Sequence, residues 1–297
     1  MRIGKDARSR FLWLCLILLW VVAWPAGREV LAAPPSKSKP SQASAVPPLD
    51  PPPALPEDAT VETRPSEEDP KATIEDPPDK LPANPLAELR RICKEAHDQY
   101  AGCDSYIVRL RRREQIAGKD HAEEVLALRF RKQPFSVHLK WLGQEGKGRE
   151  AVFVKGMYDN KIHTLLADGD LFPLPGGKRM ALAPDNPLVV AASRHSITEA
   201  GIGQTIERFT NFVEASARQG ENKPVLTYLG RRMRPEFSHS LLATLQTISG
   251  GQETALPQGG QRLWFFDPKN HLPALISTQD DHTHVVEYYC YDRYQLG

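Results

Sequence analysis

Three kinds of feature are scarce or missing in this sequence, and each absence excludes a class of function. Lys and Arg total 38 against 37 Asp and Glu, so no global field attracts nucleic acid or an anionic membrane. The sequence contains no GxSxG elbow, P-loop, HExxH pair or GxGxxG fingerprint. Its four cysteines include no CxxC pair, which disfavours zinc and redox sites. We therefore predict no catalytic residue, no metal site, no cofactor and no nucleic-acid partner.

Residues 1–32 have the pattern of a secretory signal peptide. A basic start precedes the apolar run Phe11–Ala23, which is shorter than the roughly 20 residues of a spanning helix. Small residues at the usual spacing predict cleavage after Ala32 and export to the periplasm or cell envelope. The alternative is an uncleaved inner-membrane anchor, because Trp20 and Trp24 have the character of interfacial residues.

Residues 33–85 predict a disordered linker that is rich in proline and acidic residues. The 26 prolines of the chain are concentrated here, and large apolar side chains are almost absent. Such a segment cannot offset the entropy lost on ordering. As extended polyproline it would reach at most about 150 Å at roughly 3.1 Å per residue. We expect a tether, with a proline-rich ligand for an envelope protein partner as the alternative.

Residues 86–297 predict one folded domain. Apolar residues recur at helical spacing from Leu86 to Tyr100, after the start signal Asn84-Pro85. From Tyr106 onward the hydrophobicity alternates with period two, which predicts successive antiparallel hairpins. A second helical pattern spans residues 186–220 and is weakened by two glycines, and strands then resume from about residue 225 to the end.

A long sheet that is apolar on one face must curl to cover that face. The fold class we predict is α+β: a strongly curved antiparallel sheet, or incomplete barrel, wrapped around one or two helices. Ten side chains of the first strands are candidates to line its concave apolar cavity: Tyr106, Val108, Leu110, Leu126, Leu128, Phe130, Phe135, Val137, Leu139 and Trp141. The alternative for each is an ordinary core residue that packs on the helices.

Three polar clusters each have a functional and a structural interpretation. Four arginines in residues 109–113 could meet phosphate or carboxylate groups, but nearby glutamates favour cross-strand charge pairing. Residues 280–284 with His271 could ligate a metal, but their place at a predicted hairpin turn favours solvated side chains. Residues 193–196 could form a small polar site, but Ser196 and Glu199 favour a capping box.

The cysteines of the folded domain leave two arrangements open. In an oxidising compartment, a disulfide between Cys93 and Cys103 would tie the first helix to the first strand. The alternative is three buried thiols, with Cys290 as the third.

Several segments resemble a bacterial family known as domain of unknown function 1571. They are Tyr106–Glu114, Arg131–Trp141, Lys147–Glu150 and Ser193–Thr198. The ending, Phe265–Pro273 with Glu287–Asp292, resembles the closing hairpins of the wider LolA-like group of lipoprotein-sorting carriers. The resemblance covers about Leu86 to Leu296, and its Arg-x-x-Pro-Phe-Ser-Val and Lys-Gly-Arg-Glu segments are fairly specific. It implies an incomplete β-barrel closed by helices, with an apolar cavity for acyl chains.

The sequence thus predicts an exported, non-enzymatic binding protein that holds a lipid or the acyl chain of a lipidated partner. A second hypothesis is an envelope-associated structural module with a filled core, which is positioned by its linker. A third and least favoured hypothesis is a hydrolase that uses His195 or the pair His282 and His284.

Overall fold

The computed structural model describes residues 82–297, apart from residues 172–173 and 220–225. The predicted signal peptide, residues 1–32, and nearly all of the predicted linker, residues 33–85, lie outside the described residues. In the described part, no helix is both long enough and apolar enough to cross a membrane.

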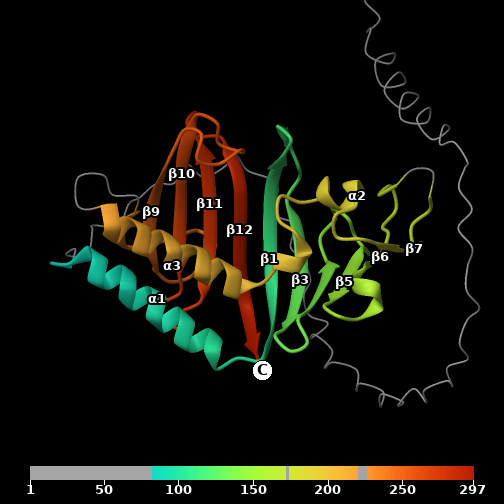
Figure 1. The fold of residues 1–297 in the computed structure, drawn as a ribbon, viewed down its shortest axis with the longest axis horizontal. Helices are drawn as coiled ribbons and strands as arrows, with labels where there is room; N and C mark the ends of the chain where they lie inside the picture. The colour runs from blue at the N-terminus through green and yellow to red at the C-terminus, as the bar shows by residue number, and fades with distance from the viewer. Residues whose placement is uncertain (1–81, 172–173, 220–225) are drawn as a thin grey trace, which may run out of the picture. The chain divides into compact units, whose positions relative to one another are not determined.

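A single antiparallel sheet of 12 strands forms the body of the domain (Figure 1). Its first half contains β1 (Ser105–Ile116), β2 (Lys119–Asp120), β3 (Glu124–Arg131), β4 (Ser136–Trp141), β5 (Glu150–Val154), β6 (Ile162–Leu165) and β7 (Arg179–Leu182). Its second half contains β8 (Leu226–Arg232), β9 (Leu241–Ser249), β10 (Gly259–Phe266), β11 (Pro273–Asp280) and β12 (Val285–Leu296). The spatial order is β7-β6-β5-β4-β3-β1-β12-β11-β10-β9-β8, with β2 paired to β1 alone.

This order shows two meanders joined side by side. Strands next to each other in the order follow one another along the chain, with two exceptions. The short β2 lies between β1 and β3 in the chain, and β1 pairs with β12, which joins the first long strand to the last. The strands turn from nearly upright at β10–β12 to nearly horizontal at β7 (Figure 1). Since β7 and β8 are the two edges of the described sheet, the sheet is open. The predicted fold class is confirmed.

Two long helices, α1 (Pro85–Ala101) and α3 (Ile202–Gln219), pack on each other and cover the β8–β12 half of the sheet (Figure 1). Helix α1 begins as its sequence predicts, because the Asn84 side chain accepts a hydrogen bond from Ala87 N at 3.0 Å and Pro85 follows the cap. The short helix α2 (Pro187–Val190) and the 3₁₀ turn η2 (Ile197–Glu199) precede α3, and a second 3₁₀ turn, η1, spans Tyr158–Asn160.

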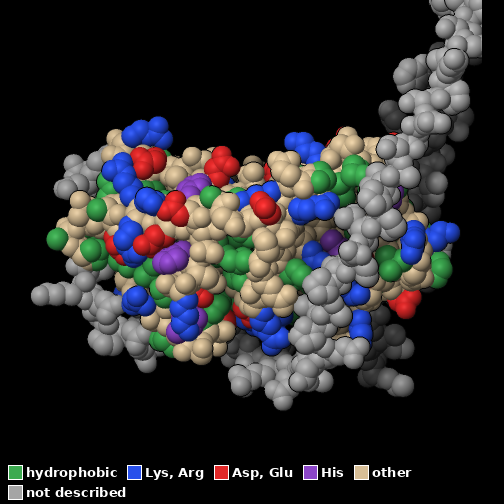
Figure 2. Space-filling model, turned by 90° about the horizontal axis from the view of Figure 1, so that it is seen from below, with side chains coloured by type: hydrophobic (Ala, Val, Ile, Leu, Met, Phe, Trp, Pro, Cys, Tyr) green, Lys and Arg blue, Asp and Glu red, His purple; other side chains and the backbone are tan. Residues whose placement is uncertain are grey.

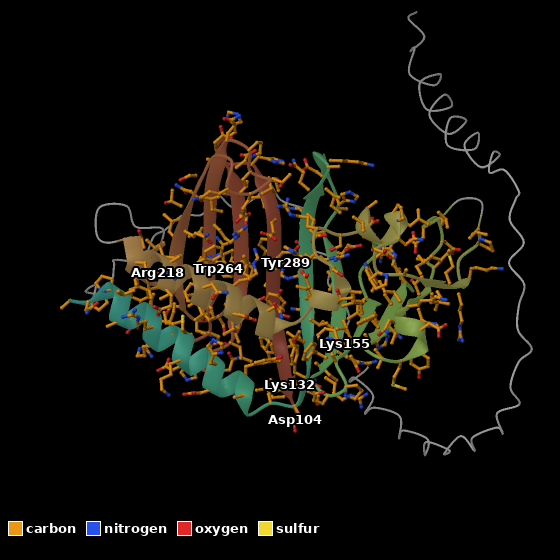
Figure 3. The ribbon with its side chains drawn as sticks, viewed as in Figure 1. Asp104, Lys132, Lys155, Arg218, Trp264 and Tyr289 are labelled. Atoms are coloured by element: carbon orange, nitrogen blue, oxygen red, sulfur yellow. The ribbon has the colours of Figure 1, made fainter. Side chains whose placement is uncertain are left out.

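The start of α3 is fixed by aromatic side chains of β1 and β3. Tyr106 stacks on Phe130 with ring centroids 5.0 Å apart, and the Tyr106 hydroxyl accepts a hydrogen bond from Ile202 N at 2.8 Å. Gly201 directly before the helix has φ of +117°, and a Cβ there would lie 2.8 Å from the Phe130 ring. Only glycine fits this close approach without strain. Further along α3, Phe209 packs on the ring of Trp264, which Figure 3 labels.

The β8–β12 half is also buried on its outer face, which the sequence pattern did not predict. Leu241, Ala243, Phe265 and Leu275 form a second buried cluster there, against which Phe237 packs from the segment between β8 and β9. This half of the sheet therefore has a filled layer on each side. Within the described residues, the β3–β7 half has no long helix over its inner face (Figure 1).

Candidate functional site

A cavity of about 580 Å³ lies over the inner face of the sheet half that the long helices leave uncovered. It is lined by β1, β3–β7, β11 and β12, by the segment that carries α2 and η2, and by the first turns of α3, and it has an open mouth. Its size falls within the range of roughly 300–1,000 Å³ that is typical of small-molecule sites.

The strand register explains why the lining is apolar. One row of mutually paired residues crosses five strands and faces the cavity: Leu128, Leu139, Ala151, Thr164 and Met180. A neighbouring row contributes Leu110, Leu126 and Trp141. Since alternate residues of a strand share a face, the period-two pattern of these strands produces one continuous floor that is mainly apolar.

The roof of the cavity is the segment from residue 187 to residue 201. The Asn186 side chain caps α2 by accepting a hydrogen bond from Leu188 N at 3.0 Å. Arg194 ties the segment to the sheet by donating to the carbonyls of Gln115 and Val286 at 3.1 and 3.3 Å. Leu188 lines the cavity but is 50% exposed, and Val190 is 60% exposed. The roof is thus tied to the sheet at Arg194, and its α2 part exposes apolar side chains.

One end of the cavity is a network of paired charges. Arg112 Nε donates to Glu124 at 2.5 Å, and Glu124 also accepts from Trp141 Nε1 at 2.8 Å and from Arg149 at 3.0 Å. Arg149 in turn donates to Asp170. Burial opposes ionisation of Asp170, but the hydrogen bonds from Arg149 and from Ala167 N, together with the charge of Arg149, outweigh burial and lower the pKa of this carboxyl group. These charges neutralise one another and form a polar wall.

Two further carboxylates reach the cavity from β1 and β12. Glu287 is buried and lies 2.6 Å from His195 Nε2, and it also accepts a hydrogen bond from Thr278 at 2.7 Å. Burial opposes its ionisation, but the contact with His195 and the charge of Arg262 outweigh burial and hold the pKa of Glu287 well below its usual range. Glu114 accepts hydrogen bonds from the Tyr289 hydroxyl and from Ser193 Oγ.

Five of the ten predicted lining residues face the cavity: Leu110, Leu126, Leu128, Leu139 and Trp141. The other five, Tyr106, Val108, Phe130, Phe135 and Val137, do not line it and pack in the core as the alternative interpretation had it. They lie further along the strands, where Phe130 meets Phe135 at 5.4 Å and stacks on Tyr106 below the start of α3. Aromatic rings fill the space there, so no cavity remains.

The arginines of residues 109–113 are divided between the two faces of the sheet. Arg112 points to the cavity, whereas Arg109 donates to Asp292 at 2.7 Å on the outer face. Arg111 on that outer face donates to Cys290 Sγ at 3.3 Å. Arg109 and Arg112 follow the charge-pairing interpretation. Figure 2 likewise shows basic and acidic side chains intermixed over the face that it draws.

The other two polar clusters differ in outcome. His284 lies 3.2 Å from Asp120 and His282 is exposed. Within the described residues no group of three or more His, Cys, Asp or Glu is arranged to hold a metal. Ser196 does cap η2, but it accepts from Thr198 N at 3.2 Å and makes no capping box with Glu199. The adjacent residues Ser193 and His195 line the cavity.

The disulfide between Cys93 and Cys103 is absent, and both residues are free and buried, as is Cys290. Cys93 lies in the middle of α1, whereas Cys103 follows the end of the helix and donates to Ser105 O at 2.7 Å. The eight residues that follow Cys93 up to the end of α1 at Ala101 span about 12 Å at 1.5 Å per residue. A disulfide requires Cα atoms within about 7 Å of each other. The prediction of a bridge is therefore wrong.

Several cavity residues were not recognised in the sequence, namely Arg149, Asp170, Thr205, Arg208 and Tyr289. Two signals pointed to part of this set. Arg149 lies in the Lys-Gly-Arg-Glu segment, and Glu287, Tyr289 and Tyr291 alternate along one strand as inward-facing residues do.

A family model described as "Protein of unknown function (DUF1571)" matches residues 103–296 of the 297 residues. The chain belongs to this family. The match begins just before β1 and ends at the last residue of β12, so the DUF1571 region contains the whole sheet together with the roof segment and α3. No curated protein matches this DUF1571 chain.

Three solved structures illustrate the distant similarity of this DUF1571 protein. An uncharacterized conserved protein from Thermus thermophilus is 7% identical with a TM-score of 0.39, over 71% of this chain and 88% of that chain. The lipoprotein LppX of Mycobacterium tuberculosis is 11% identical with a TM-score of 0.38, over 70% and 95%. A LolA superfamily protein from Nitrosomonas europaea is 10% identical with a TM-score of 0.25, over 70% and 93%. This similarity is too low to transfer a ligand or a partner.

Proposed function

We propose that this protein is an exported, non-enzymatic binding protein that holds a lipid, or the acyl chain of a lipidated partner, in its cavity. The observation that carries the proposal is the cavity of about 580 Å³ over an apolar row that crosses five strands. A structural module with a filled core would have no need of this space, since well-packed interiors leave few voids larger than a water molecule.

The energetics favour an acyl chain as the occupant. Each buried methylene contributes about 0.8 kcal/mol, so ten methylenes contribute about 8 kcal/mol before the costs of association. The affinity should be weaker than the roughly micromolar value to which about 8 kcal/mol alone would correspond, because the costs of association reduce this gain. The exposed side chains of Leu188 and Val190 add an apolar rim at the roof, where a chain leaving a membrane would first make contact.

The polar side chains of the cavity favour binding over hydrolysis. His195 has Glu287 as its ring partner, and Ser193 Oγ lies against Glu114 and Arg112. A hydrolase needs a nucleophile and a base within hydrogen-bond reach of each other. The His195 and Ser193 side chains do not pair with each other. Both instead connect the roof to carboxylates of the sheet, as structural supports do.

Native mass spectrometry of the protein purified from its own envelope tests this function. We expect a mass increase corresponding to one bound lipid, and solvent extraction should release that lipid. In an Ala151→Trp variant the indole would occupy the cavity, so the lipid adduct should be lost while the circular dichroism spectrum stays unchanged. A wild-type protein that is consistently empty, and that takes up no lipid from vesicles, would contradict the proposal.

A further inference from the structure

Arg208 differs from the other arginines that line the cavity. It lies on α3, half-buried, and faces the cavity together with Gln204 and Thr205 from the preceding turn. Arg112 and Arg149 are both bound to carboxylates. Among the described residues, Arg208 makes no hydrogen bond and no ion pair.

An unpaired guanidinium in a half-buried position is energetically unfavourable, because burial removes water from a charge that has no partner. The planar group has several N–H donors in a fork that matches the oxygens of a carboxylate or a phosphate. The inner carboxylates cannot fill this role, because each already has partners. Glu287 is held by His195 and by Arg262. Two arginines hold Glu124, Arg149 holds Asp170, and Glu114 accepts hydrogen bonds from Tyr289 and Ser193.

Two other carboxylates also line the cavity, Glu145 and Glu199, and both are exposed. Water screens charges at such positions, so they oppose an anion at Arg208 only weakly. The face of α3 that carries Arg208 is polar, whereas Ile206 and Phe209 point into the filled core. The helix thus places one cation at the boundary between the solvent and the apolar row.

We infer that the ligand is an amphiphile with an anionic head group, a carboxylate or a phosphate, and that Arg208 binds this head group. The inference rests on the proposed function and adds the class of ligand to it. The head lies beside Thr205 and Arg208 at α3, and the hydrocarbon chain extends along the row from Leu128 to Met180 toward β7.

Calorimetric titration of the full chain with three ligands of equal chain length tests this inference. Dodecanoate and dodecyl phosphate carry an anionic head, and 1-dodecanol has the same chain without the charge. At pH 7.5 and low salt, both anions should bind at least about tenfold more tightly than the alcohol, as charge-assisted hydrogen bonds do. The difference should shrink at high ionic strength, because salt screens a half-exposed charge.

Two matched variants identify the residue responsible. Arg208→Met should reduce the affinity for both anions to that for the alcohol, while the affinity for the alcohol changes less than twofold. Arg218→Met is the control on the same helix. Arg218 donates to the Glu214 carbonyl at 3.2 Å and lies at the far end of α3 from Tyr289 (Figure 3). This variant should leave all three affinities unchanged.

The outcomes separate the two levels of the proposal. Binding of none of the three ligands would overturn the proposed function and this inference together. Equal binding of alcohol and anions would overturn the inference alone, as would an Arg208→Met variant that weakens all three ligands equally. If both anions bind more tightly than the alcohol, the preferred anion distinguishes a phospholipid-like ligand from a fatty acid, and either result supports the inference.

Discussion

The same substitution, alanine to leucine, should have opposite effects on stability at two buried positions. Ala151 on β5 faces the cavity, whereas Ala243 on β9 is fully buried in the outer core. Three added carbon atoms at Ala151 would enter open space. At about 0.8 kcal/mol per buried carbon, and with allowance for the open mouth of the cavity, the gain should be about 1–2 kcal/mol. At Ala243 the same atoms would overpack a filled cluster, at a cost of about 1–3 kcal/mol.

Urea denaturation of the delipidated variants, followed by tryptophan fluorescence, measures these differences. The affinity for 1-dodecanol gives an independent readout, because Ala151→Leu should weaken binding and Ala243→Leu should not. If Ala151→Leu lowers the free energy of unfolding as much as Ala243→Leu does, the space over β5 is already filled. The structural basis of the proposed function would then be refuted.

Three further predictions concern the supports of the site. Gly201→Ala should lower the free energy of unfolding by about 2 kcal/mol or more, because Gly201 has a positive φ and an added Cβ would meet the Phe130 ring. Gly118 also has a positive φ but no atom within 4 Å, so Gly118→Ala should cost only about 1 kcal/mol, and equal costs in urea denaturation would contradict this. Glu287→Gln should cost about 3 kcal/mol at pH 7. Folding lowers the pKa of Glu287, so the extra stability of the wild type over Glu287→Gln should be complete above the unfolded pKa near 4.3 and should be lost as the pH falls below it. The same difference in free energy of unfolding at pH 3 and at pH 7 would refute the lowered pKa. Burial raises the pKa of Cys290 to about 11 and also raises the pKa of Cys93, so both thiols should react with a disulfide reagent only after denaturation. Rapid labelling of the native protein would contradict this, because it would show that the thiols are accessible.

The sequence predicted the elements well because their signals are local. Asn84 and Pro85 mark the start of α1, and the period-two pattern from Tyr106 onward marks the sheet. The face on which each residue lies also follows from this period. The same rule separates Arg112 from its neighbours Arg109 and Arg111, because odd and even positions point to opposite faces.

The position of the cavity along the strands could not be predicted from alternation. Period two assigns Tyr106 and Leu110 to one face, but only the docking of α3 decides that the first is covered and the second is not. One polar contact at the cavity had no local signal either. Glu114 and Tyr289 meet only because β1 pairs with β12, across most of the length of the domain.

The central claim, that the cavity accepts a hydrocarbon chain, is tested most directly by a series of primary alcohols of increasing length. The dissociation constant should fall about fourfold for each added methylene, since about 0.8 kcal/mol per methylene is a little over half of the 1.4 kcal/mol that a factor of ten requires. The improvement should stop once the chain fills the cavity, and in Ala151→Trp no alcohol should bind. Affinities that do not depend on chain length would contradict the account.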